Sequence, residues 1–114
     1  MTTWADVERV ALSLPDTALG EAHSGEPAVL VEARIFARSR EEGGVLQFWV
    51  ADERLVDGYV ESDGTTFRGA RGYSRRVVMA RLSGLDEGDL RDVLVASWNA
   101  RTTATLRKRH SDLV

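Results

Sequence analysis

The feature that most constrains the fold is a run of three short apolar segments between residues 28 and 50. Segments 28–31, 34–38 and 45–50 are rich in branched and aromatic residues, and only residues 32–33 and 39–44 separate them. Connections this short cannot form a parallel crossover, which needs about a dozen residues or more. Gly43 and Gly44 in the 41–44 loop favour a hairpin, because glycine readily adopts positive φ. The pattern therefore predicts an antiparallel meander of three strands.

Alternation within the third segment predicts which side chains share a face. Successive side chains of a strand point to opposite faces of the sheet. Leu46, Phe48 and Val50 therefore lie together on one face, and Trp49 lies on the other, less buried face.

Helices are predicted before and after the meander in the sequence. Residues 4–14 carry an apolar stripe at helical spacing, with Thr3 as the N-cap, Asp6 as its capping-box partner and Pro15 as the terminator. Residues 16–27 read as a loop. A short helix over 53–60 follows, with Asp52 as its cap and Leu55, Val56 and Tyr59 packing inward.

The last part of the chain predicts one more strand and two helices. Residues 77–82 are typical of a strand, and residues 65–67 add a brief one before it. Asp86 is the predicted cap of the next helix, with Asp89 in the capping-box position. Residues 103–110 are predicted to form a final helix. The order of elements predicts an α+β fold, a two-layer sandwich in which helices cover one face of an antiparallel sheet.

Length and composition limit the alternatives. The chain has 114 residues, so we expect residues 1–114 to form a single domain. It contains no cysteine, which excludes disulfides and thiolate metal sites. No apolar run approaches the roughly 20 residues that span a bilayer, and no secretory signal is recognisable. We therefore expect a cytoplasmic protein with no membrane association.

The residues offer little for catalysis or for metal binding. His23 and His110 are far apart in the sequence, and neither lies in a catalytic or zinc-binding motif. The acidic segment 86–89 is better explained by helix capping than by calcium binding. We expect no enzyme activity, no catalytic residues, no metal and no cofactor.

Charge is distributed unevenly along the chain. The net charge is −3, but residues 1–63 carry 13 acids and 5 bases, whereas residues 64–114 carry 5 acids and 10 bases. Arginine matches phosphate oxygens with a planar fork of donors, so such clusters can bind nucleic acid through its backbone. The alternative is a solvated surface paired with the acidic half. The candidate DNA contacts are Arg68, Arg71, Arg75, Arg76, Arg81, Arg107, Lys108 and Arg109.

A second hypothesis is a module that binds a small molecule or a protein. It would use a groove between the sheet and the 16–27 loop, with His23, Trp49 and Tyr73 as the candidate ligand-binding residues. Salt dependence distinguishes the two, because phosphate binding weakens steeply as salt rises and an apolar pocket is insensitive.

The order of several short motifs resembles the MmcQ/YjbR-like proteins over essentially the whole chain. The motifs are residues 4–15, 23–28, 34–38, 71–73 with 77–82, and 96–98. The resemblance implies a CyaY-like sandwich and a role as a DNA-binding protein, with no catalytic residues. The chain departs from the family pattern at Ser74, at Arg75 and Arg76, and over residues 102–106, where bases common in the family are missing.

Overall fold

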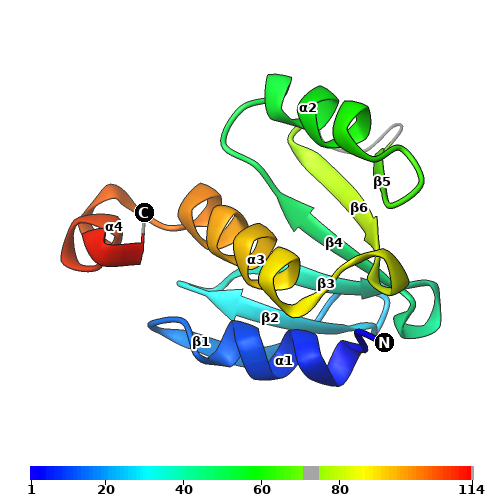
Figure 1. The fold of residues 1–114 in the computed structure, drawn as a ribbon. Coiled ribbons are helices and arrows are strands. Elements are labelled where there is room, and N and C mark those ends of the chain that lie inside the picture. The colour runs from blue at the N-terminus through cyan, green and yellow to red at the C-terminus, as the bar shows by residue number, and fades with distance from the viewer. Residues whose placement is uncertain (71–74, 114) are drawn as a thin grey trace.

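The computed structural model describes residues 1–70 and 75–113, so Arg71 and Tyr73 lie outside the described residues. A six-stranded antiparallel sheet forms the centre of the molecule, in the order β1-β2-β3-β4-β6-β5 (Figure 1). Its strands are β1 (Thr17–Glu21), β2 (Pro27–Val31), β3 (Arg34–Arg40), β4 (Val45–Trp49), β5 (Phe67–Gly69) and β6 (Val77–Arg81). The antiparallel meander predicted from residues 28–50 is confirmed as β2, β3 and β4.

Strand β1 corrects the prediction that residues 16–27 form a loop. It pairs with β2 along its whole length, from Thr17 opposite Val31 to Glu21 opposite Pro27. The segment has low intrinsic strand propensity, because Ala, Gly and Glu are all depleted in strands. Pairing with β2 therefore outweighs local preference. The 16–27 segment therefore contains the edge strand of the sheet and is not a loop that faces the sheet.

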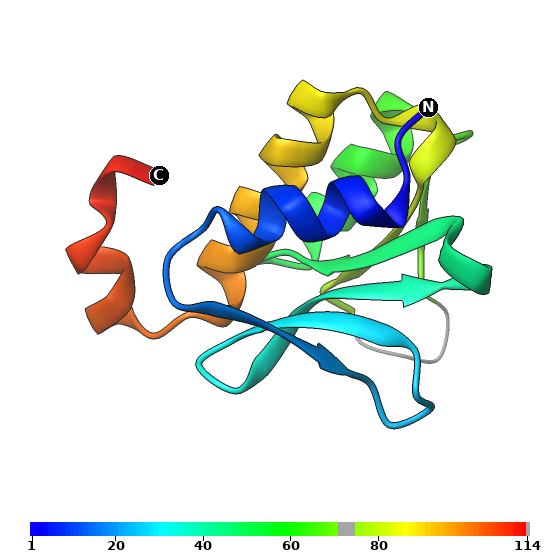
Figure 2. The ribbon, with the colours of Figure 1, turned by 90° about the horizontal axis from the view of Figure 1, so that it is seen from below.

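The helices lie on one side of the sheet, as predicted (Figure 2). They are α1 (Trp4–Leu12), α2 (Arg54–Ser62), α3 (Glu87–Arg101) and the short α4 (Ala104–Arg109). Both predicted capping boxes are present, Thr3 with Asp6 on α1 and Asp86 with Asp89 on α3. The cap of α2 differs from the prediction: Glu53 occupies the N-cap position, and the carboxylate of Asp52 accepts from the backbone N–H of Arg54.

One apolar core lies between the helices and the sheet. It contains the predicted inner residues Leu46, Phe48 and Val50, together with side chains from α1, β2, β3, β6, α3 and α4. Trp98 is fully buried at its centre, and its indole N–H donates to the carbonyl of Pro15. Val56 and Tyr59 of α2 pack against the core, but Leu55, which was predicted to face inward, is exposed.

Hydrogen bonds join the meander to the C-terminal part of the chain at two places. Beyond the last β3–β4 pair, the buried hydroxyl of Ser97 accepts from the N–H of Trp49 (2.9 Å) and donates to the carbonyl of Phe36 (2.5 Å). At the β2–β3 turn, the carboxylate of Glu32 accepts from the N–H of Thr103 (2.7 Å). These contacts join the C-terminal half of α3 and the start of α4 to the meander.

None of the helices formed by the described residues has the length and apolar character needed to span a bilayer.

Candidate anion-binding site

Four arginines lie on the face of the sheet that the helices leave uncovered. Residues directly opposite each other on neighbouring strands share a face. Leu46 and Phe48 of β4 belong to the core, so Val45 and Gln47 point the other way. Arg40 and Arg81 flank Val45 from β3 and β6, and the next row runs Arg38, Gln47, Met79, Arg68 across β3, β4, β6 and β5. We call Arg38, Arg40, Arg68 and Arg81 the arginine face.

The centre of this face is apolar and largely shielded from solvent, although no helix covers it. Val45, Val77 and Met79 are buried, and Gln47 has no exposed surface. Arginine carries a three-carbon stem that can lie along apolar surface while its guanidinium stays in water. Arginines flank Val45 and the Gln47–Met79 pair on both sides, so their stems are placed to shield these residues.

The arginine nearest β1 is committed to an internal network. Arg38 donates to the carboxylate of Glu26 (2.9 Å) and to the hydroxyl of Ser24 (3.2 Å), and its side chain is only 15% exposed. The hydrogen bond from Arg38, followed by that from Ser24, lowers the pKa of Glu26 below its ordinary value. The network ties the loop between β1 and β2 to β3, so Arg38 has a structural role on this face.

The second residue of the face, Arg40, orients a buried amide. Its guanidinium donates to Oε1 of Gln47 (2.9 Å), whose Nε2 is buried without a partner among the described residues. A buried donor left unpaired costs free energy.

The outer arginines are held weakly. Arg68 pairs with Glu41, and Arg75, just before β6, lies 3.8 Å from Glu53. All four side chains are more than half exposed. Ion pairs of this kind contribute about 0–1 kcal/mol. Among residues 1–70 and 75–113, Arg81 has no ion-pair partner.

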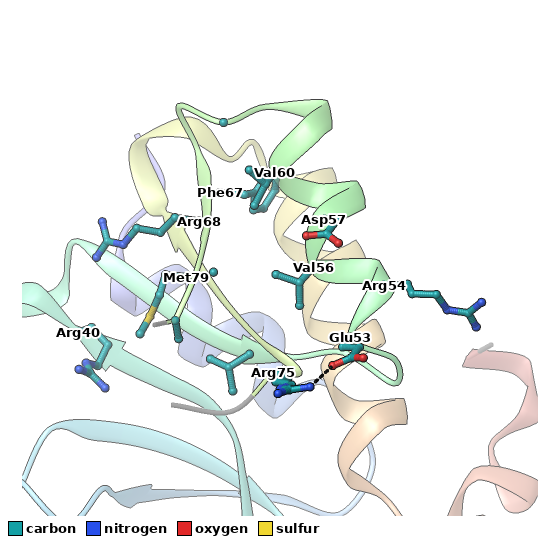
Figure 3. A pocket seen from close by; sticks show the side chains of 14 residues that line it. Arg40, Glu53, Arg54, Val56, Asp57, Val60, Phe67, Arg68, Arg75 and Met79 are labelled. Atoms are coloured by element: carbon teal, nitrogen blue, oxygen red, sulfur yellow. Dashed lines mark ion pairs between the residues drawn. The ribbon is translucent and has the colours of Figure 1, made fainter. Parts of the chain in front are cut away.

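A cavity of about 890 Å³ opens beside β5, where α2 approaches the end of the sheet (Figure 3). Its walls are apolar side chains from three elements: Val56 and Val60 of α2, Phe67 of β5, and Val77 and Met79 of β6. Charged groups surround them. Arg40 and Arg68 line the cavity on the side of the arginine face, whereas Glu53, Arg54 and Asp57 line it from α2 and the residue before it, with Arg75 beside Glu53.

The basic residues predicted from the sequence separate into two groups. Figures 1 and 2 place α4 at the opposite end of the molecule from β5. Within α4, Arg107 donates to the carbonyls of Asn99 (3.0 Å) and Thr102, near the C-terminus of α3, whereas Lys108 and Arg109 are exposed. Arg76 is exposed and its carbonyl accepts from Val50. Only Arg68, Arg75 and Arg81 of the candidates lie at the arginine face or its cavity.

The residues of the second hypothesis also lie apart from the cavity. His23 is exposed in the loop between β1 and β2, and neither it nor Trp49 lines the cavity beside β5. Trp49 faces away from the core as predicted, yet it is 9% exposed and not an open aromatic. The guanidinium of Arg101 lies 4.8 Å from the centre of its ring, within the range of a cation–π contact.

Arg38 and Arg40 are the members of the site that the sequence prediction missed. Their spacing of two residues was a usable signal, because it places both on one face of a strand. The same alternation also includes Phe36, which is a core residue. An irregularity in the β2–β3 register, which skips from Ala37 to Ile35, separates Phe36 from the two arginines. Such bulges change which face a residue occupies and leave no clear mark in this sequence.

Groups that could carry metal chemistry are not found in the described part of the chain. No cluster of three or more His, Asp or Glu side chains is arranged to hold a metal ion there. Hydrogen bonds from the side chain and backbone of Arg54 lower the pKa of Asp52 to about 2. This pair lies at the surface before α2 and is a local helix-start contact.

Comparison with known proteins identifies a fold relative. No family model matches the sequence, and no curated protein matches it. Among solved structures, a crystal structure of Deinococcus radiodurans protein DR2400, described as having a DUF419 domain, superposes with a TM-score of 0.76. The match covers 96% of this chain and 88% of the other at 20% identity. The two proteins therefore share a fold, and the α+β sandwich is a known one.

Proposed function

We propose that this protein is a non-enzymatic DNA-binding domain that contacts phosphates through the arginine face and Arg75. The observation that carries the proposal is the register of β3, β4, β6 and β5, which gathers Arg38, Arg40, Arg68 and Arg81 on one uncovered face. Arginine on an open face can make paired hydrogen bonds to phosphate oxygens.

The spacing of these arginines favours a polyanion over a single small anion. Residues two apart on a strand are about 7 Å apart, and neighbouring strands are about 4.8 Å apart. Arg40 on β3 and Arg68 on β5 are separated by three strand spacings, or roughly 14 Å. No single phosphate reaches across that distance, whereas successive phosphates of a nucleic-acid strand do.

The carboxylates near the outer arginines do not prevent phosphate binding. The pairs Arg68–Glu41 and Arg75–Glu53 are exposed, so exchanging the carboxylate for a phosphate loses at most about 1 kcal/mol per pair. The Arg38–Glu26 pair is more buried and stays intact. Binding therefore depends chiefly on Arg40, Arg68, Arg75 and Arg81.

Membership of the MmcQ/YjbR-like family, with its CyaY-like fold, is part of the same proposal. Its support is the order of motifs along the sequence together with the shared fold of the DUF419-domain protein. The cytoplasmic location expected from the sequence also stays within the proposal.

A double substitution on the face tests the function directly. Arg40→Gln with Arg81→Gln removes two central cations, and we expect weaker binding of short DNA oligonucleotides regardless of their sequence. Each phosphate contact contributes about 0.7 to 0.9 to the slope of log affinity against log salt concentration. The double variant should therefore lower that slope by about 1.4 to 1.8, as measured by fluorescence anisotropy over a salt series.

The matched control removes two cations at the other end of the molecule. Lys108→Gln with Arg109→Gln changes the net charge equally, and we expect it to leave the salt slope within experimental error. If this control loses binding and the face variant does not, the interface is on α4 and the face is wrongly assigned. Binding that is insensitive to salt would favour the small-molecule hypothesis instead.

A further inference from the structure

We infer that the cavity beside β5 receives one unpaired base, so that this domain prefers single-stranded DNA to duplex. The inference rests on the proposed function, because the strand is held by the same arginines. It adds the form of nucleic acid that the site selects.

The shape of the cavity suits a base attached to a bound strand. Its apolar walls come from α2, β5 and β6, and Arg40, Arg68 and Arg75 line it beside them (Figure 3). Cavities of about 300 to 1,000 Å³ hold drug-sized ligands, and a nucleoside is of that size. A strand whose phosphates lie on the arginines therefore has an apolar recess next to its sugar-phosphate backbone.

The polar groups of the cavity also match a base edge. Glu53 and Asp57 line it from the side of α2, and carboxylates accept hydrogen bonds from the amino groups of bases. In a duplex those edges are paired and the ring faces are stacked, so extruding a base costs a few kcal/mol. A single strand avoids that cost, and the cavity therefore discriminates between the two forms.

Three DNA probes test the inference on the unaltered protein. They are a mixed-sequence single strand, the same strand with abasic sites throughout, and its duplex. Burying one base on apolar side chains is worth about tenfold or more in affinity. We expect the abasic strand, which keeps every phosphate, and the duplex each to bind about tenfold more weakly than the intact strand in fluorescence anisotropy.

A substitution that fills the cavity provides a second test. Gly69 lines the cavity, and a Cβ added there meets only Cγ1 of Val56, at an ordinary contact distance of 3.5 Å. Gly69→Leu should abolish the tenfold preference for the intact strand over the abasic one. Gly69→Ala is the matched control, and we expect it to retain most of the preference.

The outcomes separate this inference from the function on which it depends. If no probe binds with steep salt dependence, the proposed function fails. If all three probes bind equally and with the same salt slope, phosphate binding stands and the base-binding inference is overturned. A free nucleoside monophosphate that displaces the intact strand at comparable concentration would also overturn it, because the cavity would then serve a small ligand.

Discussion

At the scale of single residues, the turn between β2 and β3 places two non-glycine residues at positive φ, where glycine is normally preferred. Glu32 and Ala33 have φ values of 51° and 64°, in the left-handed region that costs an L-residue about 1–2 kcal/mol. Two successive residues of positive φ suit the right-handed twist of a hairpin, where Asn-Gly is the usual choice. Glu32 has a compensating role, because its carboxylate caps α4 at Thr103. Ala33 has no comparable contact in the described structure.

Replacing Ala33 by glycine should therefore stabilise the protein. We expect Ala33→Gly to raise the free energy of unfolding by about 0.5–1 kcal/mol, after the greater entropy of glycine in the unfolded chain is subtracted. Urea denaturation measures the change. The same substitution within α3, Ala96→Gly, should lower it by about 1 kcal/mol. If both substitutions lower the free energy of unfolding by similar amounts, the turn is not strained at Ala33.

The turn also shows what residue-level reading of the sequence can predict. The two-residue connection was correctly placed at residues 32–33 from its flanking apolar segments. Its conformation was not predictable, because neither Glu nor Ala signals positive φ. The same holds in the loop after β3, where Glu41 and Glu42 take positive φ as well as the expected Gly43. Backbone geometry imposed by strand pairing overrides residue preference at these positions.

At the scale of elements, the charged network of Glu26 and Arg38 tethers the β1–β2 loop to β3. Strand β1 has β2 as its one neighbour in the described sheet, so an ion pair that anchors the β1–β2 loop to β3 stabilises this edge. The element with the weakest local signal is thus supported by tertiary contacts. That dependence explains why β1 escaped prediction, whereas α1 and α3, with complete capping boxes, were found.

Because of this tether, part of the free energy of unfolding is lost at acid pH. Because Arg38 and Ser24 lower the pKa of Glu26 below 4.5, the folded state is favoured while the carboxylate is ionised. This contribution is complete above about pH 4.5 and is lost as the pH falls further, through the lowered value. Glu26→Gln should therefore be less stable than the parent protein at neutral pH and show a smaller loss of stability on acidification.

Urea midpoints measured from neutral pH down to about pH 3 check this dependence. Glu61→Gln, on an exposed position of α2, removes the same charge without touching the network. If both variants lose stability on acidification to the same extent, the ion pair does not account for the effect.

At the scale of the whole molecule, positive charge is concentrated on one face, whereas apolar packing extends through all the layers. The net charge is −3, yet cations gather on one face of the sheet. Salt limits the reach of surface charges to about 8 Å at physiological ionic strength, so a ligand close to this face experiences the arginines more than the distant acids. The sequence showed the excess of bases after residue 63. It could not show that only some of them converge, because convergence depends on strand order and register.

Apolar packing, in contrast, joins the helices and the sheet into one core. A single apolar cluster includes side chains from α1, from β2, β3, β4 and β6, and from α3 and α4. We expect one cooperative unfolding transition, in which tryptophan fluorescence and far-ultraviolet circular dichroism follow the same curve. Trp98, fully buried, reports the core, and the dichroism reports the helices. Separate midpoints for the two signals would show that part of the molecule unfolds independently.

The sheet order has a consequence for biosynthesis. Strands β1 to β4 pair with their neighbours in the sequence, so they can assemble as soon as residue 49 has left the ribosome. Helix α1 packs against β1, β2 and β3, but the apolar side of β4 and much of that of β3 face α3, which ends at Arg101, and this part stays open to water until that helix emerges. Nascent chains with such surfaces are prone to aggregate. Holdase chaperones would therefore find their target in the half-made protein, during the interval between the fourth strand and the third helix.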